Sequence, residues 1–297
     1  MKSTIIFHAN CHDGVTALWA ATRRLPDADM YAGKYDEPPD LERLRGCDVV
    51  FVDFCWRRAA MVAVREVASS VLVLDHHKTA MDAMVGQGEN FVDMRSWSGP
   101  ITWERHLENI TQDADEGVHN SIYMLFDMER SGAGIAWDVL MSGNPRPLLI
   151  DYVEDRDLWR FKLIGSREVH AACSSFPLSL VARTMLMAMP IQKLIDDGSV
   201  ILRYHNKLVE TAAGHAIMAE LGGHTVPTLA CPNIELAPDI GHKLAQGHPF
   251  AAIYVDRSDG SRYYQLRSSS EGLDVGEIAQ RLGGGGHRNA AGYTRKP

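Results

Sequence analysis

The clearest indication of the fold is the segment Val71-Leu72-Val73-Leu74-Asp75-His76-His77-Lys78. Its first four residues are aliphatic, and a short apolar run with polar neighbours is typical of a buried strand in a parallel sheet, whose two faces are covered by helices. The strand ends at Asp75, so both histidines follow at its carboxyl end, the edge where open α/β sheets bind ligands. A carboxylate beside two imidazoles suits manganese, iron or zinc better than calcium. Taken alone, the triplet is an ordinary polar strand end as often as a metal site.

Two other strands are expected to end in similar side chains. The apolar run 4–8 leads into the loop 8–14, His-Ala-Asn-Cys-His-Asp-Gly, and a helix pattern follows it. The run 48–53 ends in Asp53, and a second helix pattern covers residues 57–69. Strands that alternate with helices specify a parallel, doubly wound α/β sheet. Three acidic or histidine-rich strand ends at one edge make a metal cluster the better interpretation.

These three motifs resemble motifs I, II and III of the DHH phosphoesterase superfamily in order and spacing: His8-x3-His12-Asp13-Gly14, the strand ending in Asp53, and Asp75-His76-His77. The first motif departs from the family pattern, because His12 stands where an aspartate is more common. Whether His12 or Asn10 takes the place of that aspartate is left open by the sequence. An imidazole there would reduce the negative charge of the site and favour manganese over magnesium.

The resemblance implies a site that holds two divalent metal ions, with manganese expected and magnesium or cobalt as alternatives. The fourth motif of the family is an aspartate followed by an aromatic residue, which Asp157 fits best and Asp155 second best. The metal ligands implied are His8, His12, Asp13, Asp53, Asp75, His76 and Asp157. The catalytic residues implied are Asp53, Asp75, His76 and His77, of which His77 would contact the scissile phosphate.

The C-terminal part contains four consecutive glycines, followed by His287. Such a run is more often a flexible turn than a phosphate cradle. Here, however, Gly-Gly-Gly-His-x-x-Ala-Ala-Gly follows a strand with Leu-Arg-Ser, and this combination resembles the substrate-binding DHHA1 domain. The resemblance implies that a terminal phosphate or nucleotide is held by His77, Arg267, Ser268, Gly284, Gly285, Gly286, His287 and Asn289.

The chain is expected to contain a DHH metal-binding domain over residues 1–165, a helical linker over 166–215 and a smaller α/β DHHA1 domain over 216–297. Residues 91–120 lose clear periodicity and are interpreted as an insertion. A lid, a contact between the copies of a homodimer and a plain surface excursion remain open for this segment.

Composition excludes several classes of protein. The 297 residues carry a net charge of −8, which argues against holding long nucleic acid through phosphate contacts. No apolar run is long enough to cross a membrane and no signal peptide is apparent, so a cytoplasmic protein is expected. The five cysteines include no Cys-x-x-Cys pair and are expected to be free thiols.

The expected function is therefore metal-dependent hydrolysis of short nucleotides, such as oligoribonucleotides, pAp or linearised cyclic dinucleotides, as in the nano-RNase or oligoribonuclease members of the superfamily. The alternatives are a RecJ-like single-strand exonuclease, an exopolyphosphatase, and a protein that binds nucleotides without hydrolysing them. Exact substrate and cleavage polarity do not follow from the sequence.

Overall fold

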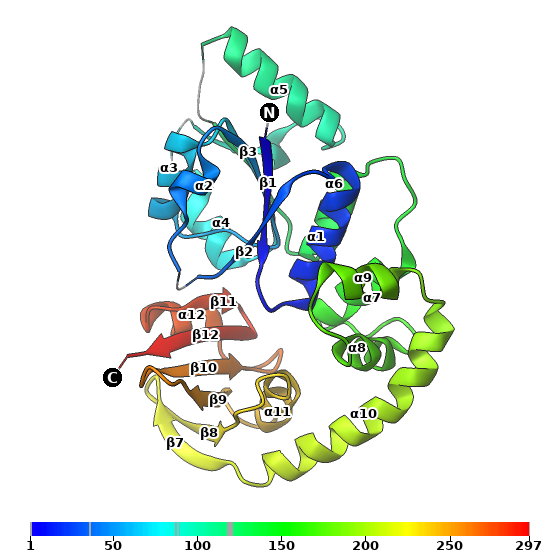
Figure 1. Cartoon of the computed structure of the whole chain (residues 1–297). Coiled ribbons are helices and arrows are strands. Elements are labelled where there is room, and N and C mark those ends of the chain that lie inside the picture. The colour runs from blue at the N-terminus through cyan, green and yellow to red at the C-terminus, as the bar shows by residue number, and fades with distance from the viewer. Residues whose placement is uncertain (1, 36, 87, 89, 118–120, 297) are drawn as a thin grey trace. The chain divides into compact units, whose positions relative to one another are not determined.

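The computed structural model describes residues 2–35, 37–86, 88, 90–117 and 121–296. The chain divides into two compact units, unit 1 (Met1–Ser199) and unit 2 (Val200–Pro297). Each unit has its own sheet, and the two are described separately below (Figure 1). Within the described part of the chain, no helix is both long and apolar enough to span a bilayer.

Unit 1 is built on a six-stranded sheet with the strand order β2-β1-β3-β4-β6-β5. Every pairing in this sheet is parallel. The strands are β1 (Lys2–His8), β2 (Asp29–Gly33), β3 (Cys47–Val52), β4 (Ser70–Asp75), β5 (Phe91–Asp93) and β6 (Ile122–Phe126). The predicted strand ending at Asp75 is confirmed as β4, which lies inside the sheet between β3 and β6.

Helices cover both faces of this sheet (Figure 1). Successive residues of each strand point to opposite faces, so Ile5 packs in one apolar cluster and Ile6 in the other. One face is covered by α1 (His12–Arg24) and α6 (Gly132–Leu140). The other is covered by α2 (Leu41–Leu44), α3 (Arg58–Val67) and α4 (Lys78–Met84). The doubly wound α/β architecture predicted from the sequence is confirmed.

The order of the strands reverses at β1, which lies between β2 and β3. The helix after β1 lies on one face of the sheet, whereas the helix after β3 lies on the other. The carboxyl ends of these two neighbouring strands therefore border a crevice of the kind in which open α/β sheets bind ligands. The loop 8–14 and Asp53 both lie at this point.

The segment interpreted as an insertion is part of the core of unit 1. It contains β5, which pairs with β6 at the sheet edge, a 3-10 turn (Met94–Ser96) and α5 (Trp103–Asp115). Met94, Trp103 and His106 are buried. A plain surface excursion is therefore the wrong interpretation, and the role as a lid or dimer contact remains a prediction. Residues 118–120 lie outside the described residues.

Most of the segment expected to be a linker also belongs to unit 1. It forms α8 (Ser166–Ser174), α9 (Leu180–Met187) and the first part of α10 (Ile191–Ala213). Val169, Leu186 and Leu194 from these helices pack against α7 (Leu148–Asp157) in one apolar cluster. The helical prediction is correct, and the boundary between the units falls inside α10, within the segment 166–215. Met185, which has core-like spacing, is exposed.

Unit 2 has a mixed six-stranded sheet with the order β11-β12-β10-β9-β8-β7, in which only β8 and β9 pair in parallel. Its strands are β7 (Ile217–Leu221), β8 (His224–Ala230), β9 (Ala251–Asp256), β10 (Arg262–Arg267), β11 (Gly285–His287) and β12 (Ala290–Arg295). One face packs on α12 (Val275–Arg281) and the other on α11 (Ala237–Leu244). The predicted smaller α/β domain is confirmed.

Candidate metal centre

Asp53 is the residue around which the site is built. It follows β3, is buried, and has a left-handed backbone with φ of 56°. Its backbone N–H donates to the carbonyl of Leu74 at 2.9 Å, which fixes it beside the end of β4. The N-terminus of α6 comes so close that a Cβ added to Gly132 would lie 2.3 Å from the Cβ of Asp53. Only glycine allows this approach.

The two carboxylate oxygens of Asp53 face different groups of side chains. Its Oδ1 lies 3.1 Å from His76 Nε2, and its Oδ2 lies 3.5 Å from His8 Nδ1. His76 Nε2 in turn lies 3.7 Å from Asp13 Oδ2 and 3.6 Å from Asp157 Oδ2. Asp53 therefore lies between His8, at the end of β1, and a second group in which His76 is close to Asp13 and Asp157. This is the placement that a carboxylate bridging two cations requires.

Among the described residues of unit 1, three sets of side chains each bring their ligand atoms within 4.8 Å of one another. Asp53 belongs to two of them. The sets are His8, Cys11 and Asp53; Asp13, His76 and Asp157; and Asp53, Asp75 and His77. Six of the seven predicted ligands, all except His12, are thus brought together at the carboxyl edge of the sheet.

Asp13 is held by the N-terminus of α6. Its Oδ2 accepts a hydrogen bond of 2.6 Å from the N–H of Gly132, and its Oδ1 accepts one of 3.1 Å from Ala133. Free N–H groups and the helix dipole favour a carboxylate at this position. Burial, together with the charges of Asp53 and Asp157, nevertheless raises the pKa of Asp13 well above its usual value. A cation at the site would relieve this repulsion.

Asp75 orients the two histidines that follow it. Its Oδ1 accepts hydrogen bonds from the N–H groups of His76 and His77, at 2.8 and 3.3 Å, and lies 2.7 Å from Nδ1 of His77. The Nδ1 contact fixes the orientation of the His77 ring, so that Nε2 points away from Asp75. The other carboxylate oxygen, Oδ2, is available as a ligand.

The electrostatics of the cluster suit cations. Burial alone would lower the pKa of His76, but its hydrogen bond to Asp53 and the charge of Asp157 raise that pKa well above the usual value. The imidazolium thus takes the place of a positive charge among buried carboxylates. Within the described residues, the buried atoms His8 Nδ1, Asp53 Oδ2 and Asp75 Oδ2 have no hydrogen-bond partner. Buried nitrogen and carboxylate oxygen atoms without a hydrogen-bond partner are well suited to bind a divalent ion, so the residues fit the predicted metal site.

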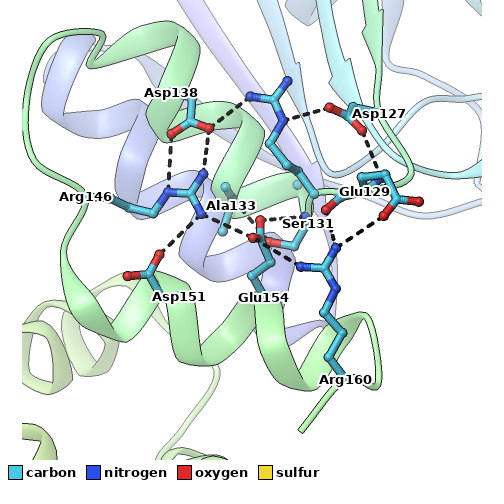
Figure 2. A network of polar contacts seen from close by, with 12 residues as sticks. Asp127, Glu129, Ser131, Ala133, Asp138, Arg146, Asp151, Glu154 and Arg160 are labelled. Atoms are coloured by element: carbon cyan, nitrogen blue, oxygen red, sulfur yellow. Dashed lines mark hydrogen bonds and ion pairs between the residues drawn. The ribbon is translucent and has the colours of Figure 1, made fainter. Parts of the chain in front are cut away.

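A network of charges holds α6 and α7 together beside this cluster (Figure 2). Glu154 of α7 accepts a hydrogen bond of 3.0 Å from the N–H of Ser131, which caps α6, and lies 3.3 Å from Arg146. Arg160 approaches Glu154 from the other side, and Arg146 also contacts Asp138 (Figure 2). Because α6 positions Asp13 and α7 carries Asp157, the network fixes two ligands from different helices.

The structure corrects the prediction for His12. Its Nδ1 lies 2.9 Å from Arg183 Nη2 and its Nε2 lies 3.1 Å from Ser174 Oγ, so both ring nitrogens have other partners. Arg183 can only donate, so Nδ1 must be the unprotonated nitrogen. Burial and the charge of Arg183 lower the pKa of His12 to about 3. His12 is therefore a neutral residue that joins α1 to α8 and α9 rather than a metal ligand.

Asn10 does not take the place of the motif I aspartate either, since it is exposed on the loop with φ of 56°. Cys11, which lies between Asn10 and His12 in the sequence, is the further residue of this loop that joins His8 and Asp13 in the cluster. The sequence pattern predicts Cys11 only as a free thiol, and free thiols are confirmed for all five cysteines. The position of Cys11 three residues after His8 was the signal that could have identified it as a ligand.

The structure also decides between the two aspartates of the fourth motif. Asp157 Oδ2 faces His76, whereas Asp155 accepts hydrogen bonds from the N–H groups of Lys162 and Leu163, at 2.9 and 3.1 Å. Asp155 therefore closes the loop after α7, and Asp157 is the candidate ligand.

We expect the two aspartates to differ under the same substitution. Asp157→Asn should lower metal affinity or activity by about 10–100-fold with little change in melting temperature. Asp155→Asn should mainly destabilise the fold, by about 1–3 kcal/mol, because it weakens two buried hydrogen bonds. Metal titrations and thermal denaturation of both variants measure the difference, and the reverse pattern would exchange their roles.

The predicted substrate residues of unit 2 lie close together around one end of β10. Arg267 pairs with Ala290, and the side-chain amide of Asn289 donates to Ser268 Oγ at 2.9 Å. The glycine run differs from the expected loop, because Gly285 and Gly286 form β11 with His287 and pair with β12. Close contact with β12 excludes side chains at Gly284 and Gly286. Binding of substrate by these residues remains a prediction.

Comparisons with known proteins give one match to a domain family. Residues 239–296 match the DHHA1 domain. An uncharacterized protein of Acanthamoeba polyphaga mimivirus is 26% identical over 317 residues, which cover 98% of this chain. The chain spans 66% of the length of that relative, slightly less than two thirds.

Solved structures with a related arrangement include two of low identity. A pGpG-specific phosphodiesterase, PggH of Vibrio cholerae, is 11% identical with a TM-score of 0.38, over 99% of this chain and 92% of that one. An exopolyphosphatase-related protein of Bacteroides fragilis is 13% identical with a TM-score of 0.41, over 100% and 87% of the two chains. Similarity at this level carries no argument about substrate. The family match therefore shows a C-terminal DHHA1 domain, and the motifs gathered at one sheet edge of unit 1 resemble those of the DHH phosphoesterases.

Proposed function

We propose that the protein is a divalent-metal-dependent phosphoesterase that hydrolyses short nucleotides. The observation that carries this proposal is the position of Asp53, whose two oxygens face separate groups of ligand atoms, 3.1 Å from His76 and 3.5 Å from His8. Paired divalent ions neutralise phosphate oxygens and supply a nucleophilic water at neutral pH. The cluster therefore has the donor set that phosphate ester hydrolysis needs.

The residues of the chain have separable roles in this proposal. His8 and Asp53 would hold one ion, Asp13, His76 and Asp157 the other, and Asp75 Oδ2 is available to either. Nδ1 of His77 donates to Asp75 at 2.7 Å, and although burial would lower the pKa of His77, the charge of Asp75 raises it. The imidazolium of His77 is proposed to donate from Nε2 to the scissile phosphate. Imidazole and carboxylate ligands together favour manganese, with magnesium or cobalt as alternatives.

The proposed substrates are oligonucleotides of a few residues, pAp or linearised cyclic dinucleotides. A net charge of −8 gives little attraction for a long polyanion, so binding must depend on a small number of contacts. The DHHA1 match supports unit 2 as the source of those contacts. Arg267, Ser268, His287 and Asn289, with the backbone of Gly284, Gly285 and Gly286, are proposed to bind the terminal phosphate or nucleotide.

A hydrolysis panel tests the proposed function. With manganese, catalytic efficiency should fall by about tenfold or more between two-nucleotide and thirty-nucleotide strands, since the net charge of −8 repels the additional phosphates of a longer strand. The panel should contain pAp, di- to pentaribonucleotides, linear and cyclic dinucleotides, long single-stranded DNA and polyphosphate. Arg267→Ala should raise KM for the preferred short substrate without changing metal affinity.

Other outcomes of the panel would contradict the proposal. Equal efficiency on short and long strands would indicate a RecJ-like exonuclease, and preference for polyphosphate an exopolyphosphatase. Binding of nucleotides without turnover under any of the three metals would indicate a protein that has lost catalysis.

A further inference from the structure

Cys11 differs from the other cysteines in what surrounds its thiol. Cys55 directs its Sγ to the carbonyl of Trp56 at 3.3 Å, and Cys231 directs its Sγ to the carbonyl of Asn233 at 3.2 Å. Cys47 likewise lies near backbone carbonyls. Such thiols fill space in the core. The Sγ of Cys11 instead lies with the ligand atoms of His8 and Asp53, within 4.8 Å of one another.

The backbone fixes Cys11 in this position. It is the N-cap residue of α1, with extended φ and ψ of −125° and 136°, and its carbonyl accepts the first helical hydrogen bond, from Val15 at 3.1 Å. Its side chain makes no capping hydrogen bond to the helix. Gly14 packs directly against the backbone of His8, since a Cβ added to Gly14 would lie 2.3 Å from the His8 carbonyl oxygen. The turn from β1 into α1 therefore presents His8 and Cys11 together.

Two further atoms beside this thiol are able to bind a metal ion. His8 Nδ1 and Asp53 Oδ2 are buried and lie 3.5 Å from each other, and within the described residues neither has another hydrogen-bond partner. A nitrogen, a sulfur and a carboxylate oxygen that converge on one point are a typical donor set for a transition metal.

We propose that Cys11 is a thiolate ligand of the metal ion held by His8 and Asp53, and that this centre prefers a softer ion than its neighbour does. The inference rests on the proposed function and adds to it a difference between the two ions. The Asp13, His76 and Asp157 group offers one nitrogen and two oxygens, whereas the His8 group offers one nitrogen, one sulfur and one oxygen. Coordination replaces the thiol proton by the metal and releases that proton to solvent. Cobalt, iron or zinc should therefore occupy the His8 centre in preference to magnesium.

Cobalt absorption tests this proposal on the full chain. Co²⁺ bound by a thiolate gives a strong charge-transfer band in the near ultraviolet, which imidazole and carboxylate ligands do not give. Titration of the wild type with Co²⁺ without oxygen should produce this band, and Cys11→Ser should abolish it. Cys55→Ser is the matched control, since Cys55 is also close to the site but donates to a carbonyl, and it should retain the band. Cys11→Asp should bind cobalt without the band.

Alkylation of the wild type gives a second measurement if the serine variant does not fold. Iodoacetamide labelling of Cys11, followed by mass spectrometry, should slow by about tenfold at a Co²⁺ concentration ten times its Kd. A band that persists in Cys11→Ser, or equal labelling with and without Co²⁺, would overturn the proposal. Wild type that binds Co²⁺ and hydrolyses substrate without the band would refute the Cys11 ligand alone. Wild type that binds none of manganese, magnesium and cobalt would refute the proposed function as well.

Discussion

Replacing Asp53 by alanine should lower kcat/KM for a short nucleotide by on the order of 10³-fold, because the variant loses the carboxylate that faces both ligand groups. Removing it would leave two like-charged ions without a shared anion between them. His76 would also lose its contact of 3.1 Å and His8 its contact of 3.5 Å. Metal stoichiometry, measured by elemental analysis of the purified variant, should fall together with activity.

Asp48→Asn is the matched control for this substitution. Asp48 lies near the opposite end of the same strand, where it accepts a hydrogen bond of 2.8 Å from Ser70. This variant should keep its metal content and activity. Near wild-type hydrolysis by Asp53→Ala in the presence of manganese would show that Asp53 does not bridge the ions.

Gly132→Ala should have the second largest effect, although residue 132 contributes no ligand. Its new methyl group would lie 2.3 Å from the Cβ of Asp53 and 2.7 Å from its Cα, so either α6 or the end of β3 must move. Overpacking of this kind costs about 1–3 kcal/mol of stability. Movement of α6 would also displace the Gly132 N–H that Asp13 accepts at 2.6 Å. Activity should therefore fall by about 10–100-fold, as when the partners of metal ligands are removed.

Thermal denaturation and steady-state kinetics measure the two parts of this effect. Gly214→Ala serves as the control, because a methyl group there would have its nearest neighbour at 3.4 Å and no left-handed backbone is needed. A fully active Gly132→Ala protein with an unchanged melting temperature would mean that α6 does not constrain Asp53.

The sequence predicted the parallel sheet and most of the site because both depend on a repeated local pattern. Apolar runs that end in Asp53 or Asp75 identify strands and place their ends at one edge, whatever the rest of the fold does. His12 could not be assigned in this way. It is adjacent to Asp13, but its partners Ser174 and Arg183 are more than 160 positions away in the sequence. Only tertiary packing decides which residues of the loop face the cluster.

The extent of unit 1 and the pairing of the glycine run could not be predicted for a related reason. An amphipathic helix such as α10 has the same pattern whether it connects two units or packs in one, and here Leu194 is buried in unit 1. Consecutive glycines similarly indicate that another backbone segment lies close to them, but they do not identify that segment. The neighbour is β12, and the pairing of Gly285 with Gly292 is a contact that no local signal reveals.

The left-handed backbone of Asp53 has a consequence for engineering. At φ of 56°, glycine or asparagine is the residue that the local backbone favours, and an aspartate there costs on the order of 1 kcal/mol. Burial would raise the pKa of Asp53, but its contacts with His76 and His8 lower it, so the cluster stabilises the charge that the backbone does not favour. Asp53→Gly would relieve the backbone cost and lose these contacts at the same time. A search for thermostable variants should therefore hold residue 53 fixed, because a substitution that suits the backbone removes the carboxylate on which the proposed catalysis depends.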